Sequence, residues 1–178
     1  MALNWIQENI EYFGGDSSKV TIAGESAGSW SVMHHLLSPE SEGLFRAVIG
    51  QSGTTISGMA DRLMTEEEAF ANGQNYAQEV GCYEDSDIWD ADSVLECLKT
   101  KTPRELFDAH VSGTFKSRPN IDSFSDHTPL LPQDPELLFS SEQFSKVPVL
   151  LGTNSGEGIL NVPEYIKKYG KLPNYCNC

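Results

Sequence analysis

The sequence predicts an α/β fold with a mostly parallel sheet and helices on both faces. Three short apolar runs have the length and the β-branched and aliphatic content of buried strands, and segments with helical patterning separate them. Because buried strands that alternate with helices build parallel sheets, we expect these runs to pair with one another. The runs are residues 19–23 (KVTIA), 46–50 (RAVIG) and 147–152 (VPVLLG).

The helices are predicted from apolar periodicity and from their end signals. Apolar residues recur at steps of three and four in residues 2–13, and a glycine pair ends this pattern. Thr65 and Glu68 have the spacing of a capping box, and Thr102 followed by Pro103 is typical of a helix start. Helices are therefore expected at residues 2–13, 27–37, 65–81, 90–100, 102–110, 134–144 and 162–170.

Composition excludes several classes of function. The 178 residues carry a formal net charge of −14, which argues against a nucleic-acid-binding protein because such proteins need basic surfaces. No apolar run approaches the roughly 20 residues that span a bilayer, and the N-terminus does not have the pattern of a signal peptide. The cysteines form no C-x-x-C pair, so we expect neither a metal site nor a cofactor.

A serine between two glycines is the first candidate for chemistry. In VTIAGESAGSWSV, residues 20–32, Ser26 lies between Gly24 and Gly28 where a predicted strand meets a predicted helix. At so sharp a turn, side chains at both flanking positions are expected to collide, which favours glycine there. The helix N-terminus would direct backbone N–H groups at a developing oxyanion. The alternative is a glycine-rich turn without chemistry.

A nucleophilic serine needs a base, and the base needs an acid that orients it. Glu157, in the glycine-rich loop after the third run, is the candidate acid, because sites form beyond the carboxyl ends of parallel strands. Its spacing alone favours a solvated loop glutamate. Each histidine is better explained as a structural or exposed residue than as the base. The histidines, which all precede Glu157, are His34, His35, His110 and His127.

These features together resemble the type-B carboxylesterase and cholinesterase family of α/β-hydrolases. The similarity extends from about residue 2 to residue 170. It rests on three stretches: ALNWIQENIEYFGGDSSKVTIAGESAGSWSV, LLSPESEGLFRAVIGQSGT and VPVLLGTNSGEG. It implies a serine hydrolase that cleaves small carboxylic esters through an acyl-serine intermediate. In this resemblance Ser26 is the nucleophile, the N–H of Ala27 is an oxyanion donor, and Glu157 orients the catalytic histidine.

The resemblance also bears on how much of the catalytic domain this chain contains. Family members carry a glycine-rich oxyanion loop before the nucleophile region and a catalytic histidine after the acid, and nothing in this chain corresponds to either. We therefore interpret residues 1–178 as a partial catalytic domain that is inactive by itself, with residues 60–135 as a helical and loop insertion above the sheet. No signal for an oligomeric state is present.

The cysteines fall into two pairs. Cys82 and Cys97 enclose a short acidic loop, and their spacing alone leaves open whether they are bonded. The resemblance implies that they form a disulfide, and hence a secreted or extracellular-facing protein. Cys176 and Cys178 depart from the family pattern, and we assign them no role.

Two alternatives stay open within the family. Cholinesterases have a tryptophan shortly after the QSG block that helps to shape the acyl pocket, whereas Met59 falls near that place here. This favours a general carboxylesterase over a cholinesterase. The family also includes adhesion proteins that lack the nucleophile. Ser26 argues against that class for the whole protein, but a non-catalytic binding module stays an alternative.

Overall fold

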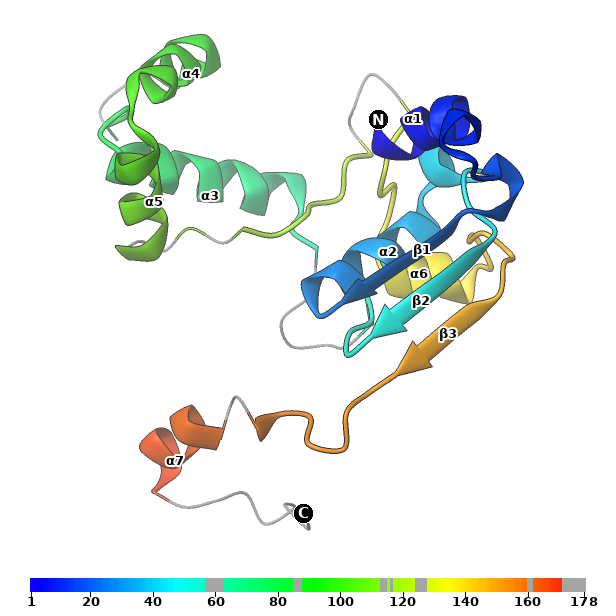
Figure 1. Ribbon diagram of the computed structural model, residues 1–178. Coiled ribbons are helices and arrows are strands. Elements are labelled where there is room, and N and C mark those ends of the chain that lie inside the picture. Colours follow the sequence, from blue (N-terminus) through cyan, green and yellow to red (C-terminus); the bar gives the residue numbers. More distant parts are fainter. Residues whose placement is uncertain are drawn as a thin grey trace.

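A three-stranded parallel sheet is the centre of the fold (Figure 1). The computed structural model describes residues 1–56, 63–84, 88–112, 115, 117–123, 128–159 and 162–170. The strand order is β1 (Thr21–Glu25), β2 (Ala47–Gln51) and β3 (Val149–Gly152), which confirms the predicted parallel strands with shifts of one or two residues. Because the strands are parallel, their carboxyl ends meet at one edge of the sheet.

The predicted helices are present. The capping box at Thr65 is complete, with both reciprocal hydrogen bonds to Glu68. Two helices are shorter than predicted: the first ends at Asn9 and continues as a 3₁₀ helix (Ile10–Phe13), and the sixth ends at Ser140. The α-helices are α1 (Ala2–Asn9), α2 (Ala27–Leu37), α3 (Glu66–Glu79), α4 (Ala91–Thr100), α5 (Pro103–Ser112), α6 (Pro135–Ser140) and α7 (Val162–Tyr169).

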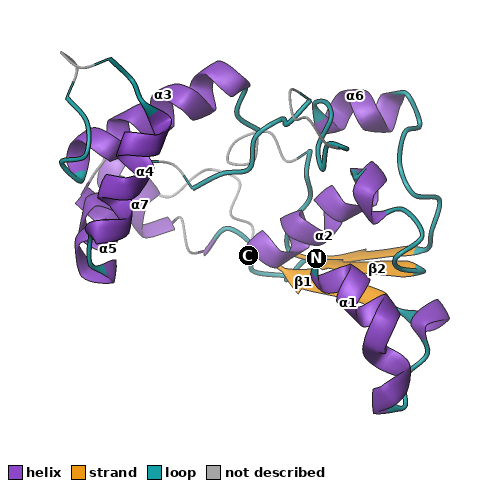
Figure 2. Ribbon diagram, turned by 90° about the horizontal axis from the view of Figure 1, so that it is seen from above, coloured by secondary structure: helices purple, strands orange, loops and turns teal. Residues whose placement is uncertain are grey.

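Helix α2 packs against β1 and β2 and lies between the sheet and α6 (Figure 2). The main cluster of buried side chains forms at this contact, where Val32, Met33 and Leu36 of α2 meet Val48 of β2 and Phe45. Each such side chain contributes about 1.5–3 kcal/mol by leaving water. This packing fixes the N-terminus of α2 beside the carboxyl end of β1.

The third strand differs from its prediction in burial. All four residues of β3 are exposed, and Leu150 retains 64% of its accessible surface, so the expectation of a buried strand is wrong for these residues. The physical reason is position: α2 packs on β1 and β2, while β3 is an edge strand of the described sheet on the side away from β1. The expectation of a buried strand is also wrong for β1, where no residue is fully buried. Thr21, Ala23 and Glu25 are exposed, on the face opposite α2.

Helices α3, α4 and α5 form a group of their own beside the sheet (Figure 1). A disulfide joins Cys82, after α3, to Cys97 of α4, which confirms the pairing that the resemblance implied. The Tyr76 hydroxyl donates to the Leu106 carbonyl at 2.9 Å and connects α3 to α5. Among the described residues, no helix is long and apolar enough to cross a membrane.

Candidate active site

Ser26 lies at a strained turn between β1 and α2. Its backbone has φ 55° and ψ −120°, a conformation that costs a non-glycine residue about 1–3 kcal/mol. Two hydrogen bonds hold the turn: the Ser26 N–H donates to the Gln51 carbonyl at 2.9 Å, and the Trp30 N–H donates to the Ser26 carbonyl at 3.1 Å. The Ser26 side chain forms no capping hydrogen bond to the described helix, so this exposed hydroxyl is available for chemistry.

The two glycines around Ser26 have different roles. A Cβ at Gly24 would lie 2.2 Å from the backbone C and O of Gly28, so only glycine fits at this contact between strand and helix. A Cβ at Gly28 would meet no described heavy atom within 4 Å. The expected collision is therefore confirmed at Gly24 and wrong at Gly28, where a Cβ would meet open space.

Ala27 begins α2, directly after Ser26. The first N–H groups of a helix have no partner within the helix, and the helix dipole adds positive potential at this end. A negatively charged oxygen that forms beside Ser26 would meet these donors. This geometry is what an oxyanion site requires.

Glu157 lies in the loop after β3. Like Ser26, it is at the carboxyl-terminal edge of the sheet, where the parallel strands end. Its Oε1 accepts the Asn154 N–H at 3.0 Å, and its own N–H donates to the Asn154 carbonyl at 3.3 Å. A hydrogen bond from the Ser52 side chain, followed by that from the Asn154 N–H, lowers the pKa of Glu157 below its usual value. Glu157 is therefore a carboxylate at neutral pH, as an acid that orients an imidazolium must be.

Ser52 is a member of this site that sequence reasoning missed. It directly follows β2, and its φ of 54° makes it a second strained serine at the same edge of the sheet. Its N–H donates to the Gly152 carbonyl at 2.8 Å, which places it beside β3 and the loop of Glu157. Its position directly after a predicted strand was the available signal.

The described histidines have surroundings that fit structural roles. His34 is buried on α2, eight residues or roughly 12 Å along the helix axis from Ser26. His35 Nδ1 lies 2.8 Å from Ser41 Oγ, and burial lowers the pKa of His35. His110 packs edge-on against Phe115, with 5.6 Å between ring centroids. Met59 and His127 lie outside the described residues.

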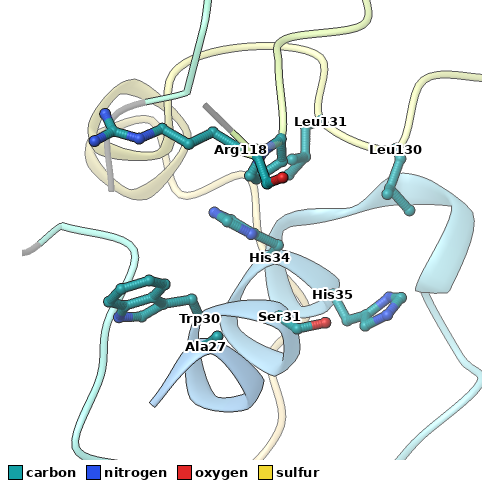
Figure 3. A pocket seen from close by; sticks show the side chains of 10 residues that line it. Ala27, Trp30, Ser31, His34, His35, Arg118, Leu130 and Leu131 are labelled. Atoms are coloured by element: carbon teal, nitrogen blue, oxygen red, sulfur yellow. The ribbon is translucent and has the colours of Figure 1, made fainter. Parts of the chain in front are cut away.

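A cavity of about 340 Å³ extends along α2 from Ala27 (Figure 3). The indole of Trp30 lies on one side and Leu130 and Leu131 lie across from the helix, so its wall is largely apolar. The lining residues are Ala27, Trp30, Ser31, His34, His35, Ser117, Arg118, Pro119, Leu130 and Leu131. Its size and lining suit a small apolar group.

Residues 1–175 match the model of the carboxylesterase family. The chain belongs to this family. The carboxylesterase-family chain is 38% identical over 156 residues to carboxylesterase 5A of Felis catus and 36% identical over 165 residues to acetylcholinesterase of Electrophorus electricus. It is 37% identical over 161 residues to neuroligin-2 of Rattus norvegicus. These alignments cover 88–89% of this chain but only 18–27% of the relatives.

Membership of the carboxylesterase family implies the α/β-hydrolase fold. The parallel sheet, and the strained turn at Ser26 that leads from β1 into α2, agree with this fold. Within the parts of the chain that the structure describes, no group of three metal-binding side chains comes together.

Proposed function

We propose that this chain is the central part of an esterase that hydrolyses small carboxylic esters through an acyl-Ser26 intermediate. The observation that carries the proposal is the strained, exposed Ser26 at the strand-to-helix turn of a carboxylesterase-family chain. Ala27 supplies an oxyanion donor, and Glu157 is the carboxylate at the same edge of the sheet.

In the proposed reaction Ser26 Oγ attacks the ester carbonyl, and its proton passes to a histidine base. The carbonyl oxygen becomes an oxyanion that accepts a hydrogen bond from the Ala27 N–H. Glu157 stabilises the imidazolium, which then gives its proton to the leaving alcohol. Water, activated by the same base, releases the acid from Ser26. The cavity beside Ala27 receives the apolar acyl group.

We propose that the base comes from outside residues 1–178, and that this chain alone has little turnover. A serine hydroxyl without a base stays protonated at neutral pH and is a poor nucleophile. The surroundings of the described histidines support this proposal: His34 is buried on α2, His35 contacts Ser41, and His110 packs on Phe115.

The same proposal covers the domain and its location. Residues 1–178 are part of an α/β-hydrolase catalytic domain, and residues 60–135 are an insertion above the sheet. The Cys82–Cys97 disulfide supports a secreted or extracellular-facing protein, because disulfides persist in oxidising compartments.

A binding module without catalysis is the second candidate. The identity to neuroligin-2 differs from that to each of the two esterases by one percentage point, so similarity alone does not separate the two functions. A cholinesterase is the other alternative within esterase chemistry, and the similarity to an acetylcholinesterase supports it.

One experiment separates these functions. The complete protein that contains this chain is assayed with nitrophenyl and choline esters, as wild type, as Ser26→Ala and as Ser93→Ala, which removes an exposed hydroxyl on α4. We expect hydrolysis of the nitrophenyl esters that Ser26→Ala abolishes and Ser93→Ala leaves intact. A preference for choline esters indicates a cholinesterase. No turnover, with partner capture that survives Ser26→Ala, indicates the binding module.

A further inference from the structure

Ser29 connects the nucleophile helix to the loop after β2. This α2 residue has no accessible surface, and its Oγ donates to the Gly53 carbonyl at 2.6 Å. The bond joins residues 24 positions apart in the chain. Without the Ser29 hydroxyl, a partly buried carbonyl loses its donor, which is costlier than the loss of an exposed hydrogen bond.

Two glycines allow this close approach. A Cβ at Gly50 would lie 2.8 Å from Ser29 Oγ. A Cβ at Gly53 would lie 2.6 Å from Trp30 Nε1 and 2.8 Å from the Ser26 carbonyl oxygen. The backbone of the loop therefore lies directly against the first turn of α2. Because these glycines have no side chain that could change its rotamer, a shift of Ser29 moves the loop backbone itself.

The contact continues to Glu157 through hydrogen bonds. Ser52, the neighbour of Gly53, donates its N–H to the Gly152 carbonyl at 2.8 Å, and its side chain bonds to Glu157. Glu157 is in turn held by the Asn154 N–H at 3.0 Å. A continuous series of contacts thus runs from the helix that begins after Ser26 to the carboxylate loop.

We propose that Ser29 is a positioning residue that holds the Ser52–Glu157 pair at a fixed place relative to Ser26. The inference rests on the proposed esterase function, which it deepens: Ser29 touches neither substrate nor base and acts through Gly53 and Ser52. Ser29→Ala removes the donor and frees the loop. Because a displacement near 1 Å in a catalytic site costs roughly 100-fold in rate, even partial loosening has a measurable effect on kcat.

The kinetic test compares Ser29→Ala with Ser41→Ala in the complete protein. Ser41 is a matched control because it is also a buried serine with one side-chain hydrogen bond, to His35, but lies after the far end of α2. For Ser29→Ala we expect kcat to fall about 10-fold or more with KM changed less than about 3-fold, and the acidic limb of the pH profile of kcat/KM to move. Ser41→Ala keeps kcat and the pH profile.

Hydrogen exchange tests the same inference without any turnover. In Ser29→Ala we expect faster amide exchange in residues 50–56 and also in residues 152–158, whereas Ser41→Ala changes neither segment. Unchanged exchange in residues 152–158, or a kcat loss equal to that of Ser41→Ala, overturns the positioning role. If the wild type has no esterase activity, the proposed function fails. Hydrogen exchange alone then tests whether Ser29 holds the loop of Glu157 in place. Ser29→Cys keeps the volume with a weaker donor and replaces Ser29→Ala if that variant does not fold.

Discussion

Alanine at Gly24 and alanine at Gly28 should have opposite effects on stability. At Gly24 the new Cβ would lie 2.2 Å from backbone atoms of Gly28, where ordinary contact begins near 3.4 Å, so α2 must move about 1.2 Å away from β1. Overpacking of this kind costs about 1–3 kcal/mol, and we expect the upper value because both partners are backbone. At Gly28 the Cβ meets open space, and alanine favours a helix over glycine by up to about 1 kcal/mol.

The two variants therefore differ by roughly 3–4 kcal/mol in the free energy of unfolding. For a chain of this length that difference separates their Tm values by about 6–16 °C. Thermal unfolding followed by circular dichroism measures it, with the wild type expected between the two variants. Equal Tm values for Gly24→Ala and Gly28→Ala, or the reverse order, would refute the packing described for the turn.

Three further results are expected. Replacing Cys82 and Cys97 by serine opens a loop of 15 residues, which costs about 3 kcal/mol and lowers Tm by about 6–12 °C; an unchanged Tm contradicts a stabilising disulfide. Burial lowers the pKa of His35, so the unfolded chain takes up a proton near pH 6.5 before the folded one does. Tm should therefore fall as pH drops from 7 to 5.5, and less so in His35→Gln; an equal fall in both variants excludes His35 as the cause. Leu130→Trp fills the cavity, so kcat/KM should fall for octanoate esters and not for acetate; an unchanged chain-length profile places the acyl group elsewhere.

The turn at Ser26 and the strand positions were predictable because their signals are local. Each of these signals occupies a few neighbouring positions in the sequence. They are the strand-forming runs, the small residue at a backbone contact, as at Gly24, and the helix start signals, as at Thr65. The parallel pairing followed from the alternation of strands and helices, which needs only chain order.

What could not be predicted depends on contacts between distant segments. The exposure of Leu150 follows from which strands α2 covers, and the apolar run itself does not contain that information. The open space at Gly28 depends on which segments of the fold surround that position. The roles of Ser29 and Ser52 come from hydrogen bonds to Gly53 and Glu157, which are far away in the chain.

Whether Ser26 is the nucleophile is measured most directly with a serine-directed phosphonate probe on the complete protein. After labelling, the protein is digested and the modified peptide is identified by mass spectrometry. We predict one phosphonylated residue, Ser26, with activity lost in proportion to labelling and no label in Ser26→Ala. A label on another residue, or ester hydrolysis that persists in Ser26→Ala, would contradict the acyl-Ser26 mechanism.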